Sequence, residues 1–122
     1  MPILAAVAEA TLTPDLVLDY LGELSTDIRA GVLLDSDGAT AAASDNEGEQ
    51  LGPLVAELFD DAAAAALPSE TISQVEVTTV VGGVFAVRDS RWTLAVVTGR
   101  YALPSLMFYD LRSVLGDLAG AT

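Results

Sequence analysis

The sequence has 122 residues, no histidine, lysine or cysteine, and 18 acidic against five basic residues, which gives a net charge of -13. This length predicts one domain over residues 1–122, and no apolar run approaches the roughly 20 residues that cross a bilayer. The charge opposes binding to nucleic acid or anionic lipid. The missing residue types exclude a Ser-His-Asp triad, a cysteine nucleophile, a lysine Schiff base and the usual zinc site. We therefore expect no enzyme, no cofactor and no metal.

The first ten residues, MPILAAVAEA, contain no basic residue before their apolar stretch and reach an acid at Glu9. A secretory signal peptide needs a positively charged start, so we expect none here. The absence of cysteine gives no sign of an oxidising compartment. These features favour a cytoplasmic protein.

A first helix is predicted over residues 14–27. Thr13 provides a side-chain cap, and Pro14 suits the first helical position because its missing N–H would be unpaired there. The apolar residues that follow recur at intervals of three and four, as one face of a helix requires. They are Val17, Leu21, Leu24 and Ile28.

The stretch GVLLDSDGATAAAS predicts a β-hairpin, because Asp37-Gly38 is a strong signal for a two-residue turn between antiparallel strands. Alanine is a weak strand former, so the returning strand is expected at a sheet edge. With the turn at the tip, each large side chain is expected opposite a small one: Leu34 opposite Ala41 and Leu33 opposite Ala42.

Asp35 and Asp37 also allow a catalytic interpretation. An apolar strand followed by two aspartates resembles the start of a phosphatase of the haloacid-dehalogenase type, in which the first aspartate is the nucleophile. Such an enzyme needs a longer chain with a doubly wound parallel sheet, a later Lys or Arg, and a later acidic pair for magnesium. Here a return strand follows Gly38 directly, so we favour turn formation as the role of both aspartates.

A second helix is predicted over residues 50–66, because Pro53 is tolerated only in a first turn. The acidic loop before it, residues 45–49, lacks the spacing of a calcium-binding loop and is expected to favour the positive helix N-terminus. The polar positions of this second helix, which include the adjacent Asp60 and Asp61, fill one narrow arc. Asp60 and Asp61 make a poor metal-binding pair, because adjacent residues of a helix point in different directions.

The apolar arc of this second helix spans roughly 200°, about twice the width that packing on one core needs. The surplus apolar surface requires a second partner. The arc comprises Leu51, Leu54, Val55, Leu58, Phe59, Ala62 and Ala66.

The stretches ISQVEVTTVV, VFAVRD and WTLAVVTG predict three strands joined by turns at Gly82-Gly83 and Ser90-Arg91. Pairing the strands through these turns gives a sheet with two apolar faces. In a sheet with one solvent-exposed face, apolar and polar residues would alternate along each strand. We therefore expect helices on both sides. One face is predicted to hold Val80, Phe85, Val87, Leu94 and Val96, and the other Thr79, Val81, Val84, Ala86, Ala95 and Val97.

A last helix is predicted to begin at Pro104 and to end at Gly120. Phe85 and Trp92, on the preceding strands, are expected in the core rather than around a ligand. The apolar stripe of the last helix comprises Leu103, Met107, Leu111, Val114 and Leu118.

The order of these elements resembles the roadblock/dynein-light-chain family, a branch of the profilin-like folds. The hairpin GVLLDSDGATAAAS, the helix LGPLVAELFDDAAAAAL, the hairpin VEVTTVVGGVFAVRD, the strand WTLAVVTG and the closing helix LPSLMFYDLRSVLGDL carry the resemblance. It implies an α+β three-layer sandwich with a five-stranded antiparallel sheet in the order 2-1-5-4-3. It also implies the first and third helices on one face and the second on the other.

The resemblance also implies a homodimer, which the surplus apolar arc favours. Two copies would pack their second helices antiparallel and join the strand ISQVEVTTVV, a sheet edge in the family order. The expected interface residues are Leu51, Leu54, Leu58, Ala62, Val75, Val77 and Thr79.

The function that the resemblance implies is regulation of a small Ras-like GTPase, without hydrolysis of GTP by this chain. Two alternatives are a small-molecule sensor of profilin-like or PAS-like shape and a pure dimeric scaffold. The strands lack convergent polar groups that would orient a ligand, which argues against the sensor. Arg88 and Arg91 are candidates for contact with a partner, although neutralisation of the nearby acids Glu76 and Asp89 is the favoured role.

Overall fold

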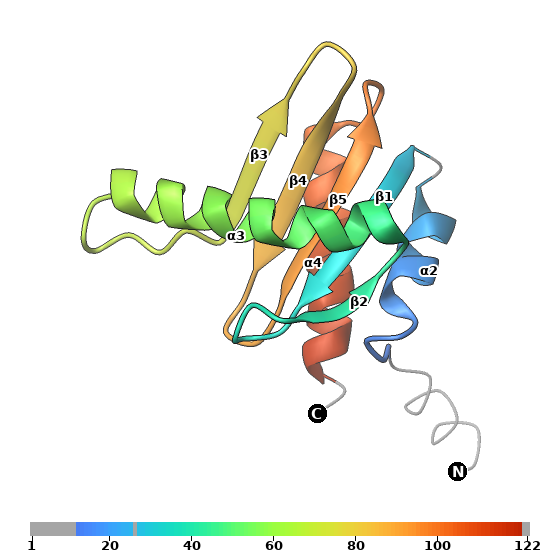
Figure 1. Cartoon of the computed structure of the whole chain (residues 1–122), viewed down its shortest axis with the longest axis horizontal. Helices are drawn as coiled ribbons and strands as arrows, with labels where there is room; N and C mark the ends of the chain where they lie inside the picture. Colours follow the sequence, from blue (N-terminus) through green and yellow to red (C-terminus); the bar gives the residue numbers. More distant parts are fainter. Residues whose placement is uncertain (1–11, 26, 121–122) are drawn as a thin grey trace.

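The computed structural model describes residues 12–25 and 27–120, and the N-terminal stretch considered above for a secretory signal lies outside them. No helix in this described part is long and apolar enough to cross a membrane. The elements, labelled as in Figure 1, are α2 (Val17–Leu24), β1 (Ile28–Leu34), β2 (Thr40–Ala43), α3 (Asn46–Ala65), β3 (Gln74–Thr78), β4 (Gly82–Arg88), β5 (Thr93–Gly99) and α4 (Pro104–Gly120).

The five strands form one sheet in the order β2-β1-β5-β4-β3, and every neighbouring pair is antiparallel. This confirms the fold class and the strand order that the sequence resemblance implies. β2 and β3 are the two edge strands, so the weak alanine-rich strand lies at an edge as predicted.

Helices cover both faces of this sheet. Successive strand residues point to opposite faces, and in β1 Leu33 packs in one core cluster whereas Val32 and Leu34 pack in another. The first cluster contains residues of α2 and α4, and the second contains residues of α3. Figure 1 shows α3 crossing the sheet in front, with α4 behind it.

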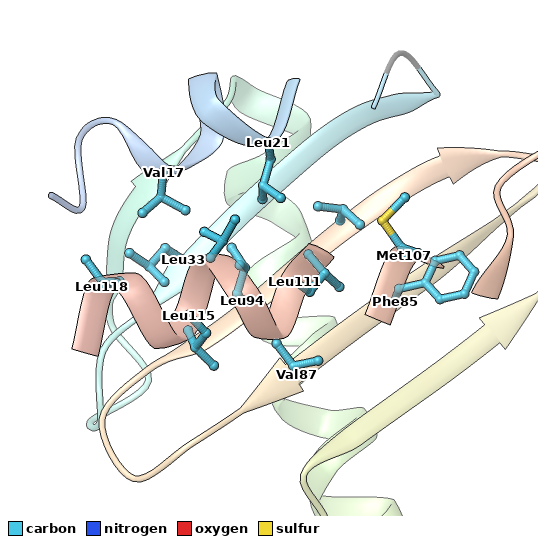
Figure 2. Packing of buried hydrophobic residues seen from close by; sticks show 12 residues of the cluster. Val17, Leu21, Leu33, Phe85, Val87, Leu94, Met107, Leu111, Leu115 and Leu118 are labelled. Atoms are coloured by element: carbon cyan, nitrogen blue, oxygen red, sulfur yellow. The ribbon is translucent and has the colours of Figure 1, made fainter. Parts of the chain in front are cut away.

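The larger core lies between the sheet and the pair α2–α4 (Figure 2). Val17 and Leu21 of α2 point towards the same space as Leu111 of α4, and all three are buried. Phe85 of β4 meets the ring of Phe108 edge-on, with 5.4 Å between the ring centroids. The stripe predicted for the last helix is buried except for Leu103, which precedes the helix and is exposed; its buried members are Met107, Leu111, Val114 and Leu118.

α3 begins four residues earlier than the sequence predicted. The side chain of Asp45 accepts a hydrogen bond from the backbone N–H of Gly48 at 3.0 Å and caps the helix, so residues 46–49 are helical rather than a loop. Pro53 consequently lies inside the helix and not in its first turn. The proline is tolerated because it and Glu49, whose carbonyl loses its partner, both lie on the exposed side, where water replaces the missing bond.

The first helix, in contrast, is shorter than predicted. A turn in which the Leu16 N–H donates to the Thr13 carbonyl precedes it, and regular helix begins only at Val17. Ile28 was placed on the helical stripe but is the first residue of β1, paired with Thr98. Periodicity misled here because an apolar residue at the expected spacing fits either element.

The β1–β2 turn contains Asp37 and Gly38 but is one residue longer than the predicted two-residue turn: the Asp35 N–H donates to the Ala39 carbonyl, which encloses residues 36–38. Gly38 has a φ of 85°, which favours glycine. The Asp35 carboxylate accepts hydrogen bonds from the N–H groups of Asp37 and Ala39, so Asp35 is a turn former. A register shift after Leu33 changes one predicted pair: Leu33 lies opposite Ala42, but Leu34 lies opposite Thr40 instead of Ala41.

The β3–β4 turn differs from the prediction. Gly82 and Gly83 are strand residues of β4, and the turn consists of Thr79, Val80 and Val81. The glycines are needed for close packing instead, because a Cβ at Gly82 would collide with the carbonyl oxygen of Thr98 in β5. The predicted faces hold for the buried strand residues, whereas Val80 and Val81 are exposed at the tip. The turn at Ser90-Arg91 forms as predicted, with Arg88 paired to Thr93.

Candidate interaction surface

The outward side of α3 carries the surplus apolar surface that the sequence predicted. Leu54 is 58% exposed, and Leu58 and Ala62 are half-buried on the same helix. Leu51 is different: it is only 4% exposed and packs in the core between α3 and the sheet. Leu51 therefore contributes mainly to the packing of the single chain.

A groove runs between α3 and the strands β3 and β4. Its volume is about 300 Å³, and most of its lining is aliphatic, with the two acids at its rim on the helix side. The lining residues are Leu51, Leu54, Glu57, Leu58, Asp61, Val77 and Val84. An aliphatic side chain from another molecule would fit such a groove, and its apolar walls would lose contact with water.

β3 continues this groove to the edge of the sheet. In the described part of the chain β3 pairs only with β4, so its outer backbone groups are available to another strand. Val75 is half-buried against the α3 core, Val77 is 39% exposed, and Thr79 lies exposed in the turn beyond the strand. Figure 1 shows α3 lying across this edge of the sheet.

Four of the seven residues predicted for an interface therefore line one groove: Leu51, Leu54, Leu58 and Val77. Ala62, Val75 and Thr79 belong to the same helix, strand and turn but do not line it. The sequence reasoning missed Val84, which lies opposite Val77. Val84 was missed because the predicted turn at Gly82-Gly83 places it opposite Val81. The actual turn, at Thr79 to Val81, places it opposite Val77.

Arg88 and Arg91 lie at the other end of β4. The Arg88 guanidinium carbon sits 4.1 Å from the centroid of the Phe59 ring, and its Nε donates to Thr93 Oγ1 at 2.9 Å. The Arg91 backbone N–H donates to the Asp89 carboxylate at 2.8 Å. Arg88 is half-buried in these contacts, so its guanidinium joins α3 to the sheet.

Replacement of Arg88 by alanine is expected to lower the free energy of unfolding by about 1–2 kcal/mol, because the contacts with Phe59 and Thr93 are lost together. Lysine should not restore this stability, since it lacks the planar group that stacks on the ring. Urea unfolding followed by circular dichroism measures the change. An Arg88→Ala protein as stable as the original would contradict this structural role.

The described residues show no group of three or more His, Cys, Asp or Glu side chains that could hold a metal ion. A second hollow, of about 260 Å³, is lined by Asp35, Asp37, Arg88 and Arg91 together with Ser36, Gly38, Ser90, Trp92 and Thr93. Asp35, the candidate nucleophile of the phosphatase interpretation, accepts hydrogen bonds from Asp37 and Ala39 in its own turn.

No protein-family model matches the chain, and no curated protein matches it by sequence. Solved structures do match. A Roadblock/LC7 domain from Streptomyces avermitilis is 20% identical, with a TM-score of 0.76 over 86% of this chain and 93% of that one. The gliding protein MglB from Thermus thermophilus is 18% identical, with a TM-score of 0.71 over 84% and 83% of the two chains.

A profilin also matches. Profilin II from Acanthamoeba castellanii is 20% identical, with a TM-score of 0.60 over 87% of this chain and 96% of that one. The chain therefore has the profilin-like fold of Roadblock/LC7 domains.

Proposed function

We propose that this chain is a homodimeric regulatory module that binds a small Ras-like GTPase and modulates its nucleotide cycle. The observation that carries the dimer is the exposed Leu54, which lies beside an apolar groove that continues to the free edge of β3. The GTPase partner is supported by the resemblance of the sequence to the roadblock family and by the shared fold.

The dimer would be isologous, so that each residue of the patch meets the same patch on the second copy. Antiparallel packing of α3 on α3 would bury Leu54 and Leu58 of both copies, and pairing of the two β3 edges would satisfy the outer backbone groups. Glu57 and Asp61 at the groove rim would then lie near their counterparts. Because both copies are strongly acidic, salt should strengthen this contact by screening the repulsion.

Binding to the GTPase would act on its mobile switch loops, placing the groups that orient water and stabilise the phosphates. An arginine donated by this chain is not part of the proposal. Arg88 is held by Phe59 and Thr93, and the Arg100 guanidinium stacks on Tyr101 and donates to its hydroxyl at 2.7 Å.

The experiment is a pull-down with the Ras-like GTPases of the source organism, loaded with GDP or a GTP analogue, followed by single-turnover GTP hydrolysis. We expect one GTPase to bind and its hydrolysis rate to change. Association of the acidic dimer with a basic GTPase surface should weaken as salt rises, opposite to the effect on the dimer itself. Failure to bind any of them in either nucleotide state would refute the partner and leave a dimeric scaffold. Binding without a rate change would refute the regulatory role.

A further inference from the structure

The tip of the β3–β4 hairpin exposes two valines. Val80 is 88% exposed and Val81 is 64% exposed, although hairpin turns are normally built from glycine, asparagine, aspartate and serine. Contact with water does not stabilise β-branched apolar side chains at such a position. Two of them side by side form an apolar knuckle, a name used below for Val80 and Val81 together.

The turn that presents this knuckle is held by Thr79. The Thr79 N–H donates to the carbonyl of Gly82 at 2.7 Å, and its hydroxyl oxygen accepts from the N–H groups of Val81 and Gly82, each at 3.2 Å. The base of the turn is fixed as well, because Gly82 packs tightly on the backbone of Thr98. An ordered turn loses little conformational entropy when it binds, which favours a role in recognition.

A hollow of about 400 Å³ lies beside the knuckle, at the end of the sheet where the β3–β4 tip and the turn after β5 come together (Figure 1). Tyr101, 76% exposed, forms an apolar wall, and Arg100 stacks on it with 5.0 Å between guanidinium carbon and ring centroid. Arg29 is the second exposed cation of the hollow. The lining residues are Asp27, Arg29, Val80, Val81, Gly99, Arg100 and Tyr101.

Two of the five basic residues of the chain thus line one hollow that contains a single acid, in a protein whose net charge is -13. This local excess of positive charge selects a partner with carboxylates. The apolar knuckle and Tyr101 select an apolar side chain next to them. An anionic bilayer fits less well, because two arginines gain only about 1 kcal/mol each at such a surface while the remaining charge repels it.

We propose that this end of the sheet is a second docking surface, which binds a protein segment carrying a bulky apolar side chain beside acidic residues. The apolar side chain would pack on Val80, Val81 and Tyr101, and the carboxylates would pair with Arg29 and Arg100. The surface shares no lining residue with the groove of α3. This second proposal does not depend on the proposed binding of a GTPase.

The test pans a random dodecapeptide phage library on the purified full chain. We expect enriched peptides to combine a bulky apolar residue with Asp or Glu close by. A fluorescent synthetic copy of one such peptide is then titrated by anisotropy. The double variants Val80→Ser/Val81→Ser and Arg29→Gln/Arg100→Gln should each weaken binding by about tenfold or more, since each removes a central group.

Leu67→Ser, in the loop before β3, and Arg91→Gln are the matched controls, because both lie at the opposite end of the sheet from the β3–β4 tip. Both should leave peptide affinity unchanged, and thermal melts should show that all variants are folded. Absence of enrichment, enrichment of basic peptides, or unchanged affinity in both double variants would overturn the proposal. So would sedimentation with phosphatidylcholine or phosphatidylserine vesicles that depends on Val80 and Val81, because it would identify a membrane as the partner.

Discussion

Replacement of Gly48 by alanine is expected to lower the free energy of unfolding by about 3 kcal/mol. A Cβ at this position would collide with the carbonyl oxygen of Gly31 in β1 and lie 3.0 Å from Ser44 Oγ. That carbonyl cannot move aside, because it accepts a hydrogen bond from the Ser44 N–H at 3.0 Å. α3 would have to lift from the sheet, which would loosen the packing of Val55 and Phe59. Urea unfolding measures the loss.

Gly116→Ala is the matched control, a second glycine inside a helix. A Cβ there meets nothing within 4 Å. Alanine should therefore stabilise α4 by about 0.5–1 kcal/mol through its higher helix propensity. We expect the free energy of unfolding to fall in Gly48→Ala and to rise in Gly116→Ala. A Gly48→Ala protein as stable as the original would show that α3 does not approach β1 as described.

Leu54→Asp is expected to dissociate the proposed dimer without unfolding the chain. Each dimer would carry two buried, unpaired carboxylates near Glu57 and Asp61, which should raise the dimer Kd by about a thousandfold. Leu54 is 58% exposed in the single chain, so its loss should change the free energy of unfolding by less than about 0.5 kcal/mol. Size-exclusion chromatography with light scattering measures the mass, and circular dichroism the fold.

Leu106→Asp provides the control for this substitution. Leu106 is 54% exposed but lies on α4, at the opposite face of the sheet from α3. This variant should keep the mass of the original protein. A Leu54→Asp protein that remains dimeric would place the contact elsewhere, and an original protein that is monomeric at micromolar concentration would remove the dimer altogether.

The element order was predictable because turns and helix ends carry local chemistry. Asp37-Gly38, Ser90-Arg91, Pro104 and Gly120 each mark a boundary that the structure confirms. The strand order came from the resemblance to a known family, since local signals do not state which strands pair across the sheet.

One error arose where tertiary packing decides, and another where two local signals disagree. The sequence predicts Gly82 as a turn residue, but in the structure its small size allows the close contact with Thr98. The sequence predicts Pro53 in the first turn of the helix, but the Asp45 cap moves the start back to Asn46, and exposure to water makes the interior proline tolerable. The contact of Gly82 has no signature in the neighbouring sequence, whereas an aspartate at a helix start is a local signal that the rule for Pro53 outweighed.

The candidate site was half predictable for the same reason. Helical periodicity identified Leu54 and Leu58 as surplus apolar positions, and both line the groove. Periodicity could not show that Leu51 is buried whereas Leu54 is exposed. The width of an apolar arc does not reveal how far the sheet extends beneath the helix. Val84 required the correct register of β3 with β4.

The molar mass of the proposed complex between this chain and a small GTPase tests the central claim most directly. Light scattering of a mixture with the GTPase, loaded with a GTP analogue, should give a complex that contains two copies of the chain and therefore twice its 12.6 kDa. Leu54→Asp should abolish that species. A complex with a single copy, or no complex with any Ras-like GTPase of the source organism, would contradict the account.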